Sequence, residues 1–351
     1  MSHTGSLIII RLRGGKTRGS FATYLGEYGV FVTRCRLLLR RGRFARVRVV
    51  HVHTLPDFLV WAALPLQRRG AKTVLDLHEI FPEFAAAKFS GLVGRTAAAV
   101  AKRVERWARR HADLTITVNR PIEALLASRP AKPDETHLVI HNSPDPLHFG
   151  TGSPRAHPDV AGPVMRLVYH GTITPMYGLE VAIRGASLAR ERGTPCHLTI
   201  IGAGPDLPRL RGLAAGLPDP DVVTFENPVP VSRVAARLRF FHAGVVPTRL
   251  DGMTRFSLSA KLLEYVWLGI PALAARLPSY ADYFPPEALW FWTPDSVDDL
   301  ARAITELAGA TPADRARRAT LALESALAVA WEGESRKLLR AYEQLLAPAP
   351  S

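Results

Sequence analysis

The stretch "LSAKLLEYVWLGIP", Leu258 to Pro271, decides how the second half of the chain folds. Its apolar residues surround a helical segment so fully that the helix should be buried, yet Lys261 and Glu264 stand inside it. An isolated carboxylate in such surroundings costs several kcal/mol. Gly269 is suited to end the helix, and Pro271 opens the next apolar strand. We therefore expect a buried helix beside a sheet, with a carboxylate kept for binding.

Short apolar runs rich in β-forming residues alternate with longer helical patterns on both sides of this stretch. The predicted strands cover residues 7–11, 47–53, 73–78, 114–118, 137–141, 167–170, 197–201, 222–225, 244–247, 270–274 and 289–292. The predicted helices cover residues 24–40, 59–69, 92–110, 122–127, 179–192, 207–217, 231–241, 260–268 and 297–307. This alternation indicates an α/β fold with parallel sheets covered on both faces.

A linker is expected between the two halves, because residues 142–163 hold five prolines and three glycines. We predict two doubly wound, Rossmann-like domains, one over residues 1–155 and one over residues 156–330. Domains of this kind bind ligands outside the carboxyl ends of their strands, so the two are expected to face each other across a cleft.

The composition excludes several classes of protein. A chain of 351 residues that is 47% hydrophobic and 22% charged is neither disordered nor fibrous. No run approaches the roughly 18 apolar residues of a membrane span, so we expect a cytoplasmic protein. Cys35 and Cys196 lie far apart without a CxxC spacing, which argues against a disulfide framework or a zinc knuckle.

Positive charge is concentrated in the first half. Residues 1–160 carry 25 Lys and Arg against 12 Asp and Glu, whereas residues 161–351 carry 20 against 19. Such a half can attract an anionic substrate, anionic lipid or nucleic acid, although arginine richness can also reflect codon usage. The segment "RCRLLLRRGRFARVR", Arg34 to Arg48, could form an interfacial helix on an anionic membrane or a solvated helix end.

Two motifs in the first half give weaker indications of a binding site. Gly14 to Thr17 resembles the end of a P-loop, but the position that requires glycine is Ile10. His51 and His53 fall on one face of a strand, as two zinc ligands would. A metal-dependent hydrolase is therefore a rival interpretation, and the alternative is two polar residues that line a cleft.

His78 and Glu79 end the next predicted strand and could complete such a metal site. The carboxyl end of a parallel strand is also the ligand side of the sheet. There His78 could donate a hydrogen bond to a sugar hydroxyl or move a proton near neutral pH. Its alternative role is simply to cap the strand.

The opening stretch offers a site for a nucleotide diphosphate. If Ser259 is the N-cap, the backbone amides of Ala260 and Lys261 point out of the helix, and the Lys261 ammonium adds positive charge. Glu264 lies one turn deeper on the same face, where it could accept hydrogen bonds from ribose hydroxyls. The alternative is a buried Lys261–Glu264 ion pair without a ligand. Two glycine-containing turns, residues 169–178 and 201–207, suit close approach of the backbone to phosphate or base.

The order of these motifs resembles the family-four retaining glycosyltransferases, of the GT-B fold, over nearly the entire chain. The matching pieces are "VVHVHTLPD", "VLDLHEIFPE", "ADLTITVN", "VIHNSPD", "LVYHGTITPMYGLEVAI", "LTIIGAGP", "KLLEYVWLGIPALA" and "WEGESRKLLRAYEQLL". The resemblance implies transfer of a sugar from a nucleotide-diphosphate donor to a sugar, lipid-linked or small-molecule acceptor, with retention of configuration. It implies no metal or other cofactor and no nucleic-acid partner.

The resemblance also implies roles for individual residues. His78 and Lys261 would be catalytic. The donor would contact Gly171, Thr172, Asn227, Pro228, Val229, Arg255, Ser259, Ala260 and Glu264. The acceptor would contact His53, Asp57 and Glu79. A helix over residues 331–351 would cross back onto the first domain.

The chain departs from the family pattern in three places. Phe256 stands where the family often has a glutamate, and Thr172 and Tyr177 stand where it often has a phosphate-binding Arg and Lys. Lys261 and Arg255 would then carry more of the charge. The first strand, glycine-rich turn and helix usual in the fold are not recognisable before Leu7, so we expect a shortened first domain. A non-catalytic sugar-nucleotide-binding protein and a sugar-nucleotide 2-epimerase remain alternatives.

Overall fold

The computed structural model describes residues 2–4, 7–12, 21–88, 91–152 and 163–348. The P-loop-like segment Gly14–Thr17 and part of the predicted linker lie outside these residues. The chain divides into two compact units, one made of Met1–Ile140 with Lys337–Ser351 and the other of His141–Arg336. The division therefore falls just before the predicted linker and again inside the last helix.

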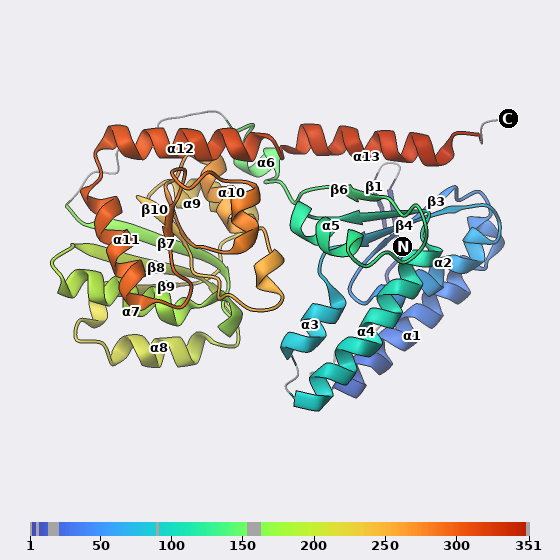
Figure 1. Cartoon of the computed structure of the whole chain (residues 1–351), viewed down its shortest axis with the longest axis horizontal. Helices are drawn as coiled ribbons and strands as arrows, with labels where there is room; N and C mark the ends of the chain where they lie inside the picture. The colour runs from blue at the N-terminus through green and yellow to red at the C-terminus, as the bar shows by residue number, and fades with distance from the viewer. Residues whose placement is uncertain (1, 5–6, 13–20, 89–90, 153–162, 349–351) are drawn as a thin grey trace. The chain divides into compact units, whose positions relative to one another are not determined.

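The first unit is built on a four-stranded parallel sheet in the order β3-β4-β5-β6 (Figure 1). Its strands are β3 (Val49–His53), β4 (Lys72–Leu77), β5 (Leu114–Thr117) and β6 (His137–Val139). Its helices are α1 (Phe21–Leu39), α2 (Val60–Gln67), α3 (Phe81–Lys88), α4 (Gly91–His111), α5 (Arg120–Ala127) and the second half of α13 (Trp331–Leu346). Among the described residues, no helix combines the length and apolarity needed to cross a membrane.

The first predicted strand does not join the parallel sheet. Residues Leu7–Ile9 form β2, which pairs antiparallel with β1 (Ser2–Thr4) in a separate two-stranded ribbon. Ile8 is 55% exposed, so this apolar run buries little surface. Pairing with a neighbour so close in sequence has a small loop-closure cost, and the apolar pattern alone could not distinguish it from pairing with the sheet.

The second unit is a six-stranded parallel sheet in the order β12-β11-β10-β7-β8-β9. Its strands are β7 (Met165–Thr172), β8 (Cys196–Ala203), β9 (Val223–Glu226), β10 (Ala243–Val246), β11 (Ala272–Ala275) and β12 (Trp290–Trp292). Its helices are α6 (Pro146–Phe149), α7 (Leu179–Glu191), α8 (Leu207–Ala215), α9 (Val231–Leu238), α10 (Ala260–Trp267), α11 (Val297–Gly309), α12 (Pro312–Leu327) and the start of α13. The prediction of α/β architecture with two Rossmann-like domains is confirmed, whereas α3, α6 and α12 were not predicted.

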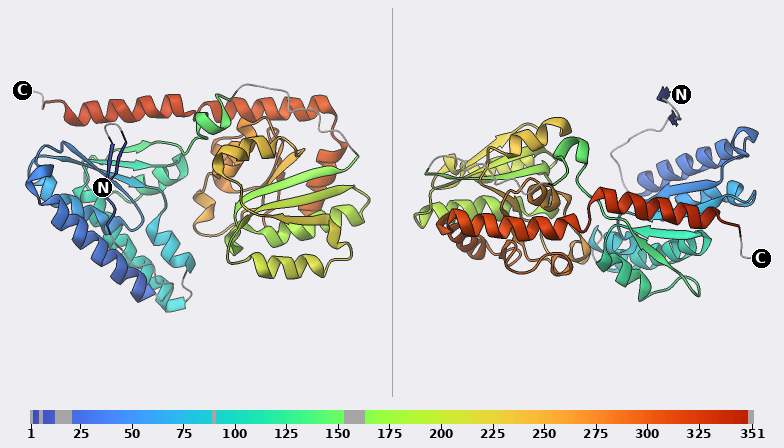
Figure 2. Two further views of the ribbon diagram at one scale, coloured as in Figure 1. Left: turned by 180° about the vertical axis from the view of Figure 1, so that it is seen from behind. Right: turned by 90° about the horizontal axis from the view of Figure 1, so that it is seen from above.

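Two apolar clusters cover the two faces of this second sheet. Helices α7, α8 and α11 cover one face of the sheet, and α9, α10 and α12 cover the other (Figure 1, Figure 2). Leu167 and Tyr169 of β7 pack with the first set of helices, while Val168 between them packs with the second set. Alternate strand residues point to opposite faces, so a strand buried on both sides must be apolar throughout. The unit is doubly wound, and α10 is one of the helices that the sheet buries.

Candidate functional site

The second sheet has a topological switch point between β7 and β10. From β7 the chain adds β8 and β9 on one side and then crosses to β10, β11 and β12 on the other. Ligands of such sheets bind where this reversal opens a crevice at the strand carboxyl ends. The loops that follow the two strands touch closely, because a Cβ on Gly178 would lie 2.1 Å from the Pro247 carbonyl oxygen.

Helix α10 begins at this switch point. Ser259 occupies the N-cap position with extended backbone, as predicted, but its side chain makes no capping hydrogen bond. Ala260, the first helical residue, is exposed, and the first amides of a helix have no partner within the helix itself. The helix presents hydrogen-bond donors and a partial positive charge that suit a phosphate group.

Lys261 lies in a corner made by aromatic rings and a glycine. Its Nζ is 3.9 Å from the ring centroid of Tyr177 and 5.5 Å from that of Tyr169. Gly171 has φ +122°, and a Cβ there would lie 2.5 Å from the Lys261 Cε, so only glycine fits. Burial lowers the pKa of Lys261 from 10.5 to about 8, and the Glu264 carboxylate opposes that shift. The ammonium therefore gives up its proton more readily than an exposed lysine.

Glu264 is held by a histidine rather than by Lys261. Its Oε2 lies 2.5 Å from His170 Nε2, and its side chain is 23% exposed. No ion pair joins Lys261 and Glu264, both of which are described residues, so the predicted alternative of such a pair is wrong. The carboxylate thus has one oxygen fixed by the protein and a side chain that solvent can reach.

His170 and Tyr265 complete this arrangement, and neither was predicted. His170 Nδ1 lies 2.9 Å from the Tyr265 hydroxyl, which also receives the His170 backbone N–H. Tyr265 is fully buried, so the pair fixes the imidazole ring against the sheet. The only signal in the sequence is a histidine immediately before Gly171 at the end of an apolar strand.

The other predicted donor residues are less closely grouped. Thr172 ends β7 beside Gly171. Arg255 is exposed in the 3-10 turn Thr254–Phe256, with its guanidinium 5.4 Å from the Phe256 ring centroid. Asn227, Pro228 and Val229 follow β9, the edge strand, which β8 separates from β7.

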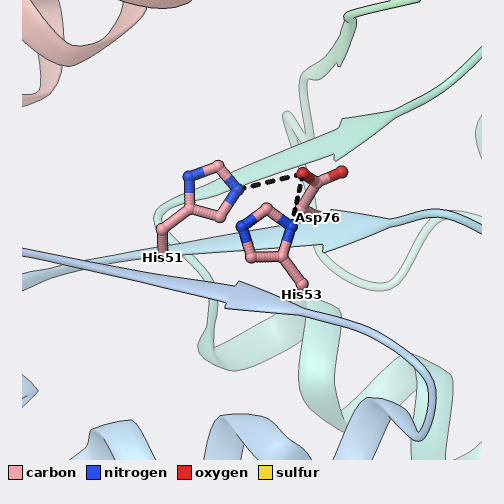
Figure 3. A group of neighbouring side chains, drawn as sticks. All are labelled: His51, His53 and Asp76. Atoms are coloured by element: carbon pink, nitrogen blue, oxygen red, sulfur yellow. Dashed lines mark hydrogen bonds and ion pairs between the residues drawn. The ribbon is translucent and has the colours of Figure 1, made fainter. Parts of the chain in front are cut away.

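The first unit brings His53 and His78 together with two residues of the same face. His53 Nδ1 and His78 Nε2 are 3.0 Å apart, and Asp76 Oδ2 lies 3.1 Å from His51 Nε2 and from His53 Nδ1 (Figure 3). Burial favours a higher pKa for Asp76, but hydrogen bonds from His51 and His78 hold it well below the ordinary range. Asp76 was missed because it stands inside an apolar strand, and Glu79 is not part of the group.

Asp57 differs from its predicted role as an acceptor ligand. It lies in the 3-10 turn Asp57–Leu59, is fully buried, and neither carboxylate oxygen has a hydrogen-bond partner in the part of the chain that the structure describes. Burial raises its pKa well above the ordinary value, and Glu105 adds to this effect. The protonated acid is therefore favoured, and the side chain does not reach solvent.

Each of the two units matches the model of a known protein family. Residues 10–146 match the model of Glycosyltransferase Family 4, and residues 165–309 match that of Glycosyl transferases group 1. No curated protein matches the chain by sequence.

Solved structures share the fold at low sequence identity. Sucrose-phosphate synthase from Thermosynechococcus elongatus has a TM-score of 0.74 and 19% identity over 96% of this chain and 82% of its own. HepE from Anabaena, in complex with UDP-glucose, has a TM-score of 0.70 and 16% identity over 91% of this chain and 84% of its own.

A third relative is the UDP-forming α,α-trehalose-phosphate synthase from Burkholderia xenovorans, in complex with glucose-6-phosphate. It has a TM-score of 0.69 and 15% identity over 91% of this chain and 79% of its own. The two family matches, one on each unit, and the two Rossmann-like domains make the chain a glycosyltransferase of GT-B architecture.

Proposed function

We propose that the protein is a retaining glycosyltransferase that moves a sugar from a nucleotide-diphosphate-sugar to a hydroxyl acceptor. The observation that carries this proposal is the grouping of Gly171, Lys261 and Glu264 at the switch point of the second sheet. The helix N-terminus and the ammonium group match the diphosphate of such a donor, and the accessible carboxylate matches its ribose.

The diphosphate would be bound by the first amides of α10 and by Lys261. Gly171 and Thr172 would lie against it, since glycine allows the backbone to approach a phosphate. Arg255 is exposed near the start of α10 and would add charge. Asn227 to Val229 would contact the base.

Glu264 would accept hydrogen bonds from the ribose hydroxyls. His170 holds one carboxylate oxygen and fixes the orientation of the group before a ligand arrives. A charge-assisted hydrogen bond to a carboxylate contributes about 1.5–3 kcal/mol. This fixed carboxylate is the main argument for a nucleotide rather than a simple phosphate.

The chemical step would depend mainly on leaving-group stabilisation. Negative charge develops on the diphosphate as the glycosidic bond breaks, and Lys261 with the helix N-terminus would stabilise it. The leaving phosphate would accept the proton of the acceptor hydroxyl on the same face, which retains the configuration. Because Lys261 supplies this charge, we propose that the donor half of the reaction uses no metal.

The acceptor would be a sugar, a lipid-linked molecule or another small molecule, and nucleic acid is not proposed as a partner. His78 and His53 would meet the acceptor or the transferred sugar, and Glu79 is exposed close by in sequence. The fully buried Asp57 would act only by supporting this region. UDP-glucose in HepE and glucose-6-phosphate in the trehalose-phosphate synthase support sugar and nucleotide-sugar ligands for this fold.

Peripheral attachment to an anionic membrane is proposed for the first unit of an otherwise cytoplasmic protein. Helix α1 exposes Val30, Phe31 and Leu37. Arg34 lies on the helix, and Arg40 follows its last residue. Apolar side chains flanked by arginine suit the boundary between headgroups and acyl chains.

A donor panel tests the proposed function. Nucleotide sugars with different bases would be incubated with wild type and Glu264→Ala, with and without candidate acceptors, and the products identified by mass spectrometry. Glu306→Ala is a matched control, because Glu306 is an exposed helical glutamate that pairs with Arg302. We expect acceptor-dependent product from wild type and the control only.

Three results would contradict the proposal. Product from the donor alone would indicate a 2-epimerase. Donor binding without product or hydrolysis across the panel would indicate an auxiliary binding protein. Equal turnover by wild type and Glu264→Ala would remove Glu264 from the donor site.

A further inference from the structure

The first unit contains a two-by-two array of metal-ligating side chains. His51 and His53 lie two residues apart on β3, and Asp76 and His78 lie two residues apart at the end of β4. His53 pairs with Asp76 in the parallel register of these strands. Because alternate residues share a face, all four side chains project from the same side of the sheet.

Three of these side chains, those of His51, His53 and Asp76, each place a ligand atom within 4.8 Å of the other two. Asp76 Oδ2 lies 3.1 Å from His51 Nε2, 3.1 Å from His53 Nδ1 and 3.4 Å from His78 Nε2. His53 Nδ1 and His78 Nε2 are 3.0 Å apart. In a tetrahedral zinc site with bonds of about 2.0–2.1 Å, neighbouring ligand atoms are separated by about 3.3 Å. The ligand atoms of His51, His53 and Asp76 are therefore close enough to share one cation, and His78 Nε2 lies next to two of these three residues.

Hydrogen bonding alone satisfies this array poorly. Three imidazole nitrogens face one carboxylate oxygen, and two of them also face each other. A neutral imidazole carries a single N–H, so each proton directed inward leaves the other ring nitrogen as an acceptor. A divalent cation would instead accept lone pairs from all four groups.

A tyrosine from α13 supports this interpretation. His51 Nδ1 makes a short contact with the Tyr342 hydroxyl. With a cation bound, Nδ1 would donate its proton to that hydroxyl, and the lone pair of Nε2 would face the cation. Metal-binding histidines usually have such a partner at the second ring nitrogen, which fixes the tautomer and the ring orientation.

We propose that His51, His53, Asp76 and His78 bind one divalent cation of the zinc class. Three imidazoles and a carboxylate suit Zn²⁺ or Co²⁺ better than Mg²⁺ or Ca²⁺, which prefer oxygen ligands. The His53 side chain is 62% exposed and that of Asp76 only 11%, so a cation can enter from solvent and reach a buried carboxylate. The site goes beyond the proposed function: it uses none of the residues proposed to bind the diphosphate and the ribose, and it leaves Nδ1 of His78 to contact the transferred sugar.

Cobalt titration of the metal-free protein tests the proposal. Tetrahedral Co²⁺ absorbs visible light strongly, whereas six-coordinate Co²⁺ absorbs weakly. We expect one equivalent of Co²⁺ to give the strong spectrum in wild type and one equivalent of Zn²⁺ to abolish it. His53→Gln should weaken Co²⁺ binding by about 100-fold or more, and this variant should stay folded because the His53 side chain is exposed.

Three further variants sharpen the test. Asp76→Asn should remove the strong spectrum, and Tyr342→Phe should weaken binding about 10–100-fold through loss of the outer partner. His197→Gln is the matched control, because His197 is a partly exposed strand histidine of the second unit whose Nδ1 lies 2.9 Å from the Asp221 carbonyl oxygen. Far-ultraviolet circular dichroism and thermal unfolding would verify that each variant is folded.

Several outcomes would overturn the assignment. These are no Co²⁺ uptake by wild type, a weak six-coordinate spectrum, and equal affinity in wild type and His53→Gln. Nucleotide binding is measured separately on the metal-free protein, where we expect it to persist. Loss of the metal site would therefore leave the donor proposal standing, and loss of nucleotide binding would leave the metal site standing.

Discussion

Raising the pH should weaken donor binding through Lys261. Burial holds the pKa of this lysine at about 8, so the ammonium is charged near neutral pH and becomes neutral in mildly alkaline solution. A diphosphate binds the charged form better, and binding therefore raises the pKa again. By linkage, the affinity must fall as the pH rises past the pKa of the ligand-free protein.

The size of the effect follows from the pKa. With a value of about 8, roughly nine-tenths of the lysine is charged at about pH 7 and roughly one-tenth at about pH 9. If the bound ammonium stays charged over this range, the association constant falls about tenfold, or about 1.4 kcal/mol. An exposed lysine with a pKa near 10.4 would give almost no change.

Isothermal titration calorimetry between pH 7 and pH 9 measures this change. Running it in two buffers of different ionisation enthalpy also counts the proton taken up on binding. Lys261→Arg is the control, because arginine stays charged throughout and any titration of the nucleotide itself appears equally in both proteins. A flat profile in wild type, or the same slope in Lys261→Arg, would refute the reasoning.

Three more predictions concern Asp57, Gly171 and helix α1. Because the pKa of Asp57 is raised, the folded state keeps a proton that the unfolded state releases above about pH 4. The free energy of unfolding therefore falls as the pH rises from about 4 towards the pKa of the folded state. Chemical denaturation should show Asp57→Asn gaining stability relative to wild type as the pH rises from about 4 to about 8, and a gap that does not change with pH would contradict this. Gly171→Ala should lower stability by about 1–3 kcal/mol, because φ is +122° and the new Cβ would meet the Lys261 side chain. The same change should weaken nucleotide binding. Gly212→Ala is the control in both assays, because no described atom lies within 4 Å of its added Cβ. Co-sedimentation with vesicles that contain anionic lipid should be salt-sensitive and should fall with Leu37→Glu, and equal binding to neutral vesicles would rule out the proposed attachment.

The second unit was the more predictable half from sequence. Its strands are mostly apolar and its helices are amphipathic, so periodicity alone located α10 and placed Lys261 and Glu264 on one face. The switch point followed from the βα alternation. What periodicity could not supply is the partner of Glu264, since His170 lies 94 positions earlier and meets it only because β7 and α10 pack together.

The first unit shows where sequence patterns fail. His51 and His53 were recognised as a pair, but Asp76 joins them only through the register of β3 and β4, which no local pattern encodes. Asp57 stands in a turn beside a proline, a setting typical of exposed residues, yet it is fully buried. Both aspartates are placed by long-range contacts, and so their environment had to come from the structure.

The central claim is that Glu264 binds the ribose hydroxyls of the donor. The most direct test compares the best-bound of UDP, GDP and ADP with its 2′,3′-dideoxy analogue, each titrated into wild type and Glu264→Ala. We predict that loss of the hydroxyls weakens binding to wild type about 10–100-fold, corresponding to about 1.5–3 kcal/mol, and barely changes binding to Glu264→Ala. An equal penalty in both proteins would contradict the account.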